Sequence, residues 1–156
     1  MFYRVMFGAE TGVAMVDDGV APDVAAGDGI YTASIPGGAF DDGEMIRWRF
    51  LASDELGLQS KLPAFREPGD SHEYVGTVAV NPGVQSLLPV VETFVQNTSA
   101  FANANDTRGA VFYLGELYDN VFVRTRGWSV RLFNAVTPPK YSNVVEFNPQ
   151  HKFLYD

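Results

Sequence analysis

The 156 residues predict a mainly-β protein whose first half is a β-sandwich. Apolar and polar residues alternate with period two along several short segments, which is typical of half-buried antiparallel strands. Clusters of Gly, Pro and Asp that mark turns recur at roughly every 8 to 14 residues in the first half, a spacing that favours a sandwich. With 46% hydrophobic residues, the chain has enough apolar material to bury a core.

The clearest strand pattern surrounds Trp48. Ile46, Trp48 and Phe50 share one face and are expected to be buried, whereas Arg47 and Arg49 lie on the opposite face and are expected to contact solvent. The strands expected in the first half cover residues 2–8, 13–16, 30–35, 44–53, 58–62 and 74–80.

The second half is also strand-rich. Polar, small residues at 97–109 indicate a loop or a short helix, and residues 115–120 are expected to connect a hairpin. The strands expected here cover residues 89–96, 110–114, 121–126, 143–147 and 152–155.

A composition change divides the chain. Residues 1–80 carry thirteen acidic and five basic residues, so the whole net charge of −8 belongs to this half, whereas residues 81–156 are neutral. The sequence therefore predicts a first domain at 1–80, a Pro/Gly linker at 81–87 that proteases should cut, and a second domain at 88–156.

The composition also excludes several classes of function. An acidic chain disfavours a nucleic-acid partner, because phosphate binding needs a basic surface. No apolar run is long enough to span a membrane. The chain has no cysteine, which excludes disulfides, thiolate zinc sites and cysteine nucleophiles.

Acidic turns in the first half suggest one possible metal site. Asp17, Asp18, Asp23 and Asp28 place four carboxylates within twelve residues, and Ca²⁺ is usually bound by such oxygen-rich loops. Their spacing does not match an EF-hand. The alternative is that Asp and Gly are present because hairpin turns require them.

The sequence assigns no catalytic residue. His72 and His151 are the only imidazoles, neither has a second ligand at metal-binding spacing, and both are expected to be solvated loop residues. No nucleophile elbow and no phosphate-binding loop is present. A Ser-His-Asp arrangement stays open, because triads assemble in space.

Basic residues in the second half suggest an anion site. Arg124 and Arg126 alternate, so they project from one strand face, and Ser129 and Lys140 follow. Cations next to a Gly turn are able to bind phosphate oxygens. The alternative is a solvated strand face with a surface lysine.

Five motifs in the second half occur in the order found at the opening of the spore-coat protein H (CotH) kinase family, which this part of the chain resembles. The pattern for that family runs Y-D-N-V, R-G-x-S-S, P-K-K-S and F-x-F-N-x-G-H-x-F. The matching residues are Leu88-Pro89-Val90, Gly115-Glu116-Leu117-Tyr118-Asp119-Asn120-Val121, Arg126-Gly127-Trp128-Ser129, Pro139-Lys140-Tyr141-Ser142 and Glu146-Phe147-Asn148, continued by Pro149-Gln150-His151-Lys152-Phe153.

The first half resembles the Ig-like module that often precedes this kinase in large secreted bacterial proteins. The matching residues are Met15-Val16-Asp17-Asp18-Gly19, Ala26-Gly27-Asp28-Gly29-Ile30-Tyr31-Thr32-Ala33, Ile46-Arg47-Trp48 and Asp70-Ser71-His72-Glu73-Tyr74-Val75-Gly76-Thr77-Val78.

The resemblance implies an Ig-like β-sandwich followed by the strand-rich start of an α+β, atypical protein-kinase-like lobe. The family transfers the γ-phosphoryl group of ATP, with Mg²⁺, to Ser or Thr of a protein substrate. Arg126, Ser129 and Lys140 match nucleotide-lobe motifs and are expected to bind ATP.

The chain is accordingly expected to be a fragment, truncated at both ends, of a secreted or cell-surface bacterial protein. It should be inactive alone, because the metal-binding and catalytic carboxylates of the family lie in a later lobe. The alternative function is a non-enzymatic adhesion or carbohydrate-binding module, in which exposed Trp48 or Trp128 would stack on sugars.

Overall fold

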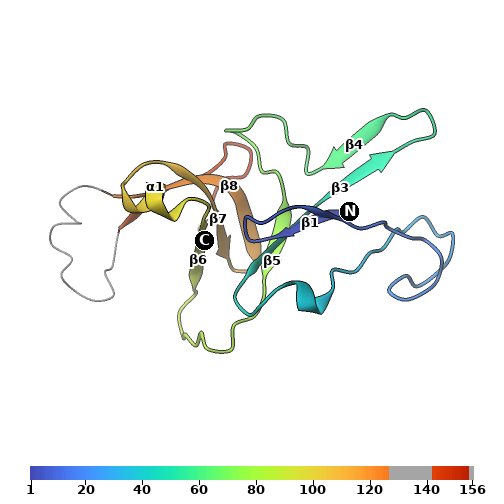
Figure 1. Ribbon diagram of the computed structural model, residues 1–156, viewed down its shortest axis with the longest axis horizontal. Coiled ribbons are helices and arrows are strands. Elements are labelled where there is room, and N and C mark those ends of the chain that lie inside the picture. Colours follow the sequence, from blue (N-terminus) through green and yellow to red (C-terminus); the bar gives the residue numbers. More distant parts are fainter. Residues whose placement is uncertain (127–141, 155–156) are drawn as a thin grey trace. The chain divides into compact units, whose positions relative to one another are not determined.

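The computed structural model describes residues 1–126 and 142–154 (Figure 1). These residues form two antiparallel sheets with almost no helix, which confirms the predicted mainly-β fold and fits a β-sandwich. The chain separates into two compact units. Unit 1 comprises Met1–Ala64 and Tyr74–Ser86, and unit 2 comprises Phe65–Glu73 and Leu87–Asp156.

The sheet of unit 1 is built around one long strand. Its order is β2-β1-β3-β4, and β5 also pairs with β3. The strand bounds are Phe2–Val5 (β1), Thr11–Gly12 (β2), Met45–Ser53 (β3), Gln59–Leu62 (β4) and Val75–Val78 (β5), with a short 3-10 helix at Gly37–Ala39.

The strand β3 forms where the pattern around Trp48 predicts it, but burial along the strand does not alternate as expected. Ile46 is buried, and Trp48 and Phe50 are half-buried. The expectation that Arg47 faces solvent is wrong, because only 4% of this residue is exposed. The guanidinium carbon of Arg47 lies 4.7 Å from the ring centre of Phe7, so the face that alternation assigns to solvent is covered.

Two of the strands expected in the first half do not form. Residues 13–16 and 30–35 are linked by a single bridge, Val16 to Thr32, and are otherwise irregular. The reason lies in the intervening turns, where the Asp17 carboxylate accepts hydrogen bonds from backbone N–H groups of the following loop. Aspartate side chains that bond to nearby backbone groups compete with ladder formation.

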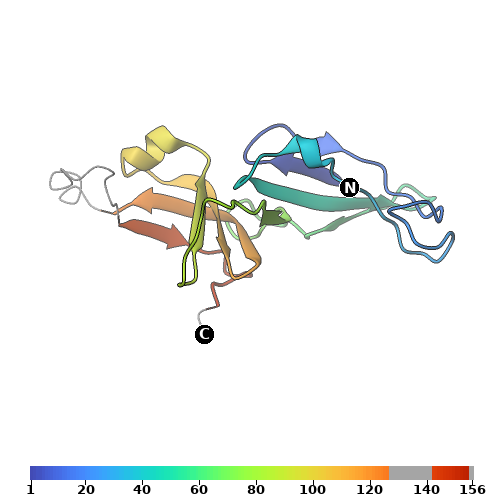
Figure 2. The same ribbon diagram turned by 90° about the horizontal axis from the view of Figure 1, so that it is seen from below.

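The sheet of unit 2 has the order β6-β7-β8-β9. A five-residue helix, α1 (Thr98–Ala102), packs against β8 (Figure 2). Asn97 caps α1 by accepting a hydrogen bond from the N–H of Ala100 at 2.9 Å. The strand bounds are Val91–Val95 (β6), Thr107–Tyr113 (β7), Glu116–Thr125 (β8) and Asn143–Glu146 (β9).

Two expectations for the second half are wrong. Residues 115–120 do not form a long connection, because the hairpin turn is only Leu114-Gly115 and the strand resumes at Glu116. Both turn residues have positive φ, as two-residue hairpin turns require. Residues 152–154 form no strand, and β9 pairs with β8 instead.

A β-bulge in β8 shapes the core of unit 2. The pairing of β7 with β8 changes register between Gly109 and Val111, and Asn120 has a left-handed φ of 57°. Leu117, Tyr118 and Asp119 are all buried. Simple alternation would expose the middle residue of such a run, so the bulge is what turns successive side chains inward.

Among the described residues, no helix has the length and apolar character needed to cross a membrane.

Candidate functional site

Of the three predicted phosphate-binding residues, the structure describes only Arg126. Arg126 directly follows β8 and is exposed. Its backbone N–H donates a hydrogen bond to the carbonyl of Ser142 at 2.7 Å. Ser129 and Lys140 lie outside the described residues, as does Trp128. The bond between Arg126 and Ser142 therefore holds together the two ends of the segment that contains Ser129 and Lys140.

Arg124 forms an ion pair with Asp106, so its guanidinium is already paired with a carboxylate. Its Nε lies 3.3 Å from a carboxylate oxygen of Asp106, and both side chains are largely exposed. Such an exposed pair stabilises the fold by about 0–1 kcal/mol, so the pair is easily exchanged for another partner.

An aromatic cluster forms where two of the family-like motifs meet. Tyr118 lies at its centre, with ring centres of Phe147 and Phe153 both at 5.3 Å and that of His151 at 4.7 Å. Tyr118 is 2% exposed, so the cluster is the interior of unit 2. Aromatic pairs at these separations stabilise a fold by about 0.5–1.5 kcal/mol each beyond their burial.

Polar side chains from the same motifs anchor neighbouring backbone. Asn148 is 3% exposed, and its Nδ2 donates to the carbonyl of Asp119 at 2.9 Å. The Asp119 carboxylate, also buried, accepts a hydrogen bond from the N–H of Glu73 at 3.1 Å. Asn120 Nδ2 donates to the carbonyls of Pro68 and Ser71 at 2.9 and 2.7 Å. Together these bonds hold residues 65–73 against β8.

The two histidines are neighbours in unit 2; both lie in loops, as expected, but they are half-buried rather than solvated. Their ring centres are 5.1 Å apart, and the Nδ1 atoms of both His72 and His151 are buried without a hydrogen-bond partner. His151 Nε2 lies 2.7 Å from a carboxylate oxygen of Glu116. Burial, followed by the charge of His151, lowers the pKa of His72, against a smaller opposing effect of Asp119.

Three of the four predicted calcium-binding residues come together. Carboxylate oxygens of Asp17, Asp23 and Asp28 lie within 4.8 Å of one another, while Asp18 is not in the group and accepts a bond from Val20 N–H at 2.9 Å. The Asp17 carboxylate accepts three backbone N–H bonds, at 2.6, 3.2 and 2.9 Å. The Asp17 carboxylate oxygens therefore already accept hydrogen bonds from the loop backbone, which leaves them fewer lone pairs for a metal ion.

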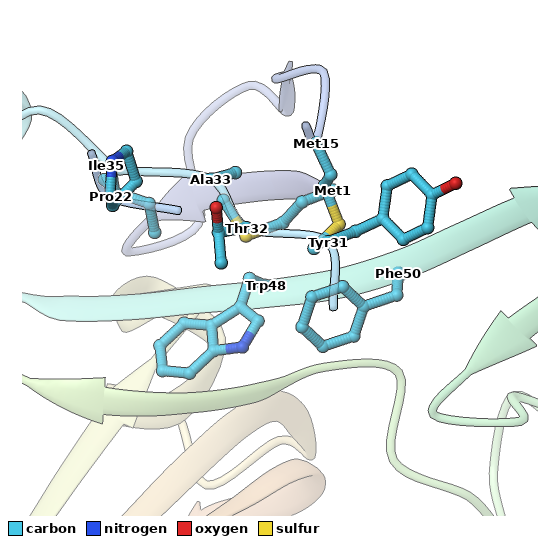
Figure 3. Close-up of a pocket in the computed structure, with 9 residues that line it drawn as sticks. All are labelled: Met1, Met15, Pro22, Tyr31, Thr32, Ala33, Ile35, Trp48 and Phe50. Carbon is cyan, nitrogen blue, oxygen red and sulfur yellow. The ribbon is translucent and has the colours of Figure 1, made fainter. Parts of the chain in front are cut away.

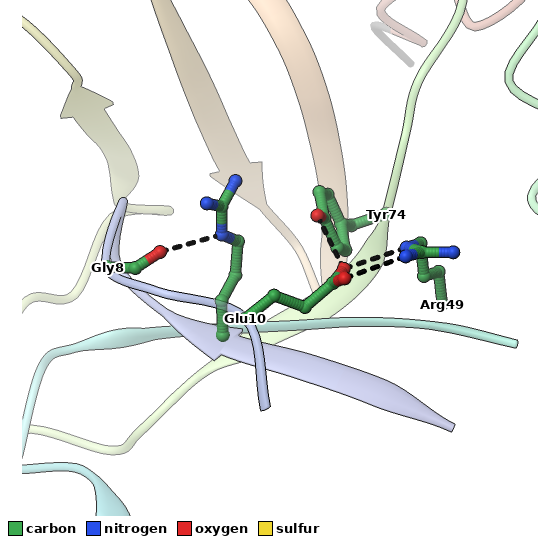
Figure 4. Close-up of polar contacts among 5 residues, drawn as sticks. Gly8, Glu10, Arg49 and Tyr74 are labelled. Carbon is green, nitrogen blue, oxygen red and sulfur yellow. Dashed lines mark hydrogen bonds and ion pairs between the residues drawn. The ribbon is translucent and has the colours of Figure 1, made fainter. Parts of the chain in front are cut away.

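A polar network that the sequence did not indicate lies on the face of the unit 1 sheet that carries Arg47 and Arg49 (Figure 4). Both carboxylate oxygens of Glu10 accept from the Arg49 guanidinium, at 2.8 and 2.7 Å, and Tyr74 Oη donates to Glu10 at 2.8 Å. The hydrogen bond from Arg49 is the main cause that lowers the pKa of Glu10, and Glu10 in turn raises that of Arg49. No sequence pattern pointed to Glu10, because its partners Arg49 and Tyr74 are distant from it in the sequence.

An apolar pocket of about 460 Å³ occupies the other face of the unit 1 sheet (Figure 3). Trp48 and Phe50 line it from β3, and Met15 and Tyr31 line it from the irregular segment. Tyr31 is 61% exposed, so an aromatic ring is accessible at this pocket.

Comparison of the chain with protein families, with curated proteins and with solved structures found no match.

Proposed function

We propose that the chain is part of a secreted, multidomain bacterial protein of the CotH-like kinase kind. In this proposal unit 1 is an Ig-like module, and unit 2 is the start of the nucleotide lobe. The complete protein transfers the γ-phosphoryl group of ATP to Ser or Thr of a protein substrate, with Mg²⁺ as the metal.

The observation that carries the proposal is the way the family-like motifs pack. Tyr118, Asp119 and Asn120 belong to one motif, and Phe147 and Asn148 belong to another. Asn148 donates to the Asp119 carbonyl, and the Phe147 ring meets Tyr118 edge-on at an interplanar angle of 85°. Because β8 and β9 are paired strands, the two motifs lie together in the interior of unit 2, and the proposal takes them as parts of one pattern.

The nucleotide would bind at the end of β8. Arg126 is exposed there, and the segment carrying Ser129 and Lys140 starts and ends beside it. Exposed cations each contribute only about 0–1 kcal/mol to such contacts, so we expect Mg-ATP to bind no more tightly than about millimolar. We expect no phosphotransfer from these residues alone, because the family's catalytic carboxylates are not among them.

Titration with Mg-ATP, followed by NMR of the backbone amides, tests the site. The amides of Arg126 and Ser142 should shift, and Arg126→Ala and Lys140→Ala should each raise the apparent Kd by up to about fivefold, as expected for the loss of about 1 kcal/mol. Lys152→Ala is the matched control, because Lys152 is an exposed cation of the same unit. Absence of any shift at about 10 mM Mg-ATP, or equal loss in Lys152→Ala, would refute nucleotide binding.

A second candidate function is sugar binding by unit 1 as an adhesion module. The specific observation is the aromatic pocket, which the exposed Tyr31 and the half-buried Trp48 both line. Aromatic faces of this kind stack on apolar faces of sugar rings. Screening of glycans by NMR should then shift the Tyr31 and Trp48 signals, and Tyr31→Ala should remove binding without unfolding unit 1.

A further inference from the structure

We propose that His72 and His151 together bind a divalent transition-metal ion, such as Zn²⁺ or Cu²⁺, through their Nδ1 atoms. Both histidines belong to unit 2, although they are distant from each other in the sequence. The ion would tie residues 65–73 to the segment that follows β9. This inference does not depend on the proposed nucleotide site, because it uses none of the residues expected to bind ATP.

The separation of the two imidazole rings suits a shared ion. The ring centres of His72 and His151 are 5.1 Å apart. A zinc ion lies about 2.0–2.1 Å from a ligating imidazole nitrogen, and therefore about 3.2 Å from the centre of that ring. Two imidazoles on one tetrahedral ion then have centres roughly 5.2 Å apart, because the angle between their bonds to the ion is about 109°. The observed separation agrees with this value.

Glu116 sets the ligating form of His151. A carboxylate oxygen of Glu116 lies 2.7 Å from His151 Nε2, and because an ionised carboxylate only accepts, Nε2 carries the ring proton. In the neutral imidazole Nδ1 then has a free lone pair, and this atom is buried with no hydrogen-bond partner among the residues that the structure describes. Metal-ligating histidines commonly donate their second N–H to a carboxylate in this way. Glu116 is therefore a positioning residue for the ligand nitrogen of His151.

His72 offers a second nitrogen of the same kind. Within residues 1–126 and 142–154, its Nδ1 is likewise buried without a hydrogen-bond partner. Burial is the main cause that lowers the pKa of His72, and the neutral ring that this favours is the form that ligates a metal. A buried polar atom without a partner destabilises the fold, and one ion would satisfy both Nδ1 atoms at once.

The charges around the two rings favour a cation over a bridging water molecule. The Glu116 carboxylate contacts His151, and the negative charge of the buried Asp119 acts on His72. The ligand atoms also restrict the kind of ion. Imidazole nitrogens suit Zn²⁺, Cu²⁺ and Ni²⁺, whereas Mg²⁺ and Ca²⁺ prefer carboxylate, carbonyl and water oxygens. The site is therefore expected to select transition metals, with water at the remaining coordination positions.

Titration of the whole chain with zinc sulfate, followed by NMR of the imidazole Cε1–H signals, tests the site. The signals of His72 and His151 should shift together and should stop shifting at one equivalent of zinc. Magnesium sulfate at the same concentrations should shift neither signal. Copper should bind more tightly than zinc in a competition experiment, as the usual order of divalent affinities requires.

Matched variants separate this site from other acidic residues. His72→Phe and His151→Phe keep an aromatic ring and remove the nitrogens. Glu116→Ala removes only the carboxylate that positions His151, and it should weaken zinc binding by about 10–100-fold. Each Phe variant should weaken binding at least as much, because it removes a ligand. Glu146→Ala, which removes an exposed acid of β9 in the same unit, is the control and should leave the affinity unchanged.

Protection from trypsin gives a second readout. Zinc at 100 times its Kd should slow cleavage after Arg66 by about a hundredfold, because the ion binds only when residues 65–73 are in place. Histidine signals that do not move at millimolar zinc would overturn the proposal. Equal zinc affinity of the unaltered chain and the Glu116→Ala variant would also overturn it, and that comparison holds even where a Phe variant fails to fold.

Discussion

Substitutions of Asn120 should separate two contributions of this residue to the stability of unit 2. Asn120 has a φ of 57°, a left-handed conformation that Asn and Gly adopt more readily than Ala. Its side chain also donates hydrogen bonds of 2.9 and 2.7 Å to the carbonyls of Pro68 and Ser71. Asn120→Gly removes the bonds and keeps the backbone conformation, whereas Asn120→Ala removes both.

The structure gives magnitudes for each variant. Two hydrogen bonds at a net value of about 0.5–1.5 kcal/mol each predict a loss of about 1–3 kcal/mol for Asn120→Gly. Asn120→Ala adds about 1–2 kcal/mol of left-handed strain. Asn120→Asp should be worse than Gly, because its carboxylate faces two carbonyl oxygens with nothing to donate.

The assay is native-state hydrogen exchange of the buried Val121 and Val123 amides, together with trypsin cleavage after Arg66. Loss of the Asn120 bonds should release residues 65–73, so cleavage should accelerate about tenfold for each 1.4 kcal/mol that the bonds contributed. Equal stability of the Gly and Ala variants would refute the backbone argument. Unchanged cleavage after Arg66 would refute the anchoring role.

Three further predictions concern other parts of the fold. Leu114→Asn should stabilise unit 2 by about 0.5–1.5 kcal/mol in urea unfolding, because Leu114 is exposed and has a φ of 48° at the hairpin turn. Asp17→Ala should destabilise unit 1 by about 1–2 kcal/mol in thermal unfolding, equally in EDTA and in Ca²⁺, because the Asp17 carboxylate bonds to backbone N–H groups; a loss seen only in Ca²⁺ would instead indicate a bound ion. The free energy of unfolding of unit 2 should fall as the pH drops below about 6.5, because burial lowers the pKa of His72 in the folded state and the unfolded chain therefore binds the proton more tightly. His72→Gln should make the unfolding free energy less dependent on pH in this range. A pH dependence that this variant leaves unchanged would contradict the burial argument.

The sequence predicts those features of the fold that depend on local periodicity. The strand around Trp48 was recognisable because period-two alternation is a property of the strand itself. The burial of Arg47 could not be recognised in this way, because Phe7 and Tyr74 cover it and both are distant from it in the sequence. Alternation assigns a residue to a face, and only the tertiary structure decides whether that face is covered.

The errors in the second half have a similar cause. The polar residues from Glu116 to Asn120 suggested a connection, because Asp119 and Asn120 are typical turn residues. In the structure they form the bulge of β8, and their side chains hold residues 65–73. The histidine pair was not predicted for the same reason, since His72 reaches His151 only because residues 65–73 fold into unit 2.

The residues that carry the family resemblance divide into two groups with different physical roles. Tyr118, Asp119 and Asn148 are buried and are engaged in packing or in bonds to backbone. Such residues stabilise a fold whether or not a nucleotide binds, so their agreement with the family pattern does not bear on activity. Arg126 and Lys140 are the residues on which the proposed ATP binding depends. Absence of a Mg-ATP shift at Arg126 would refute the proposed nucleotide site without changing the packing of these buried residues, and the aromatic pocket of unit 1 would then be the surface to pursue.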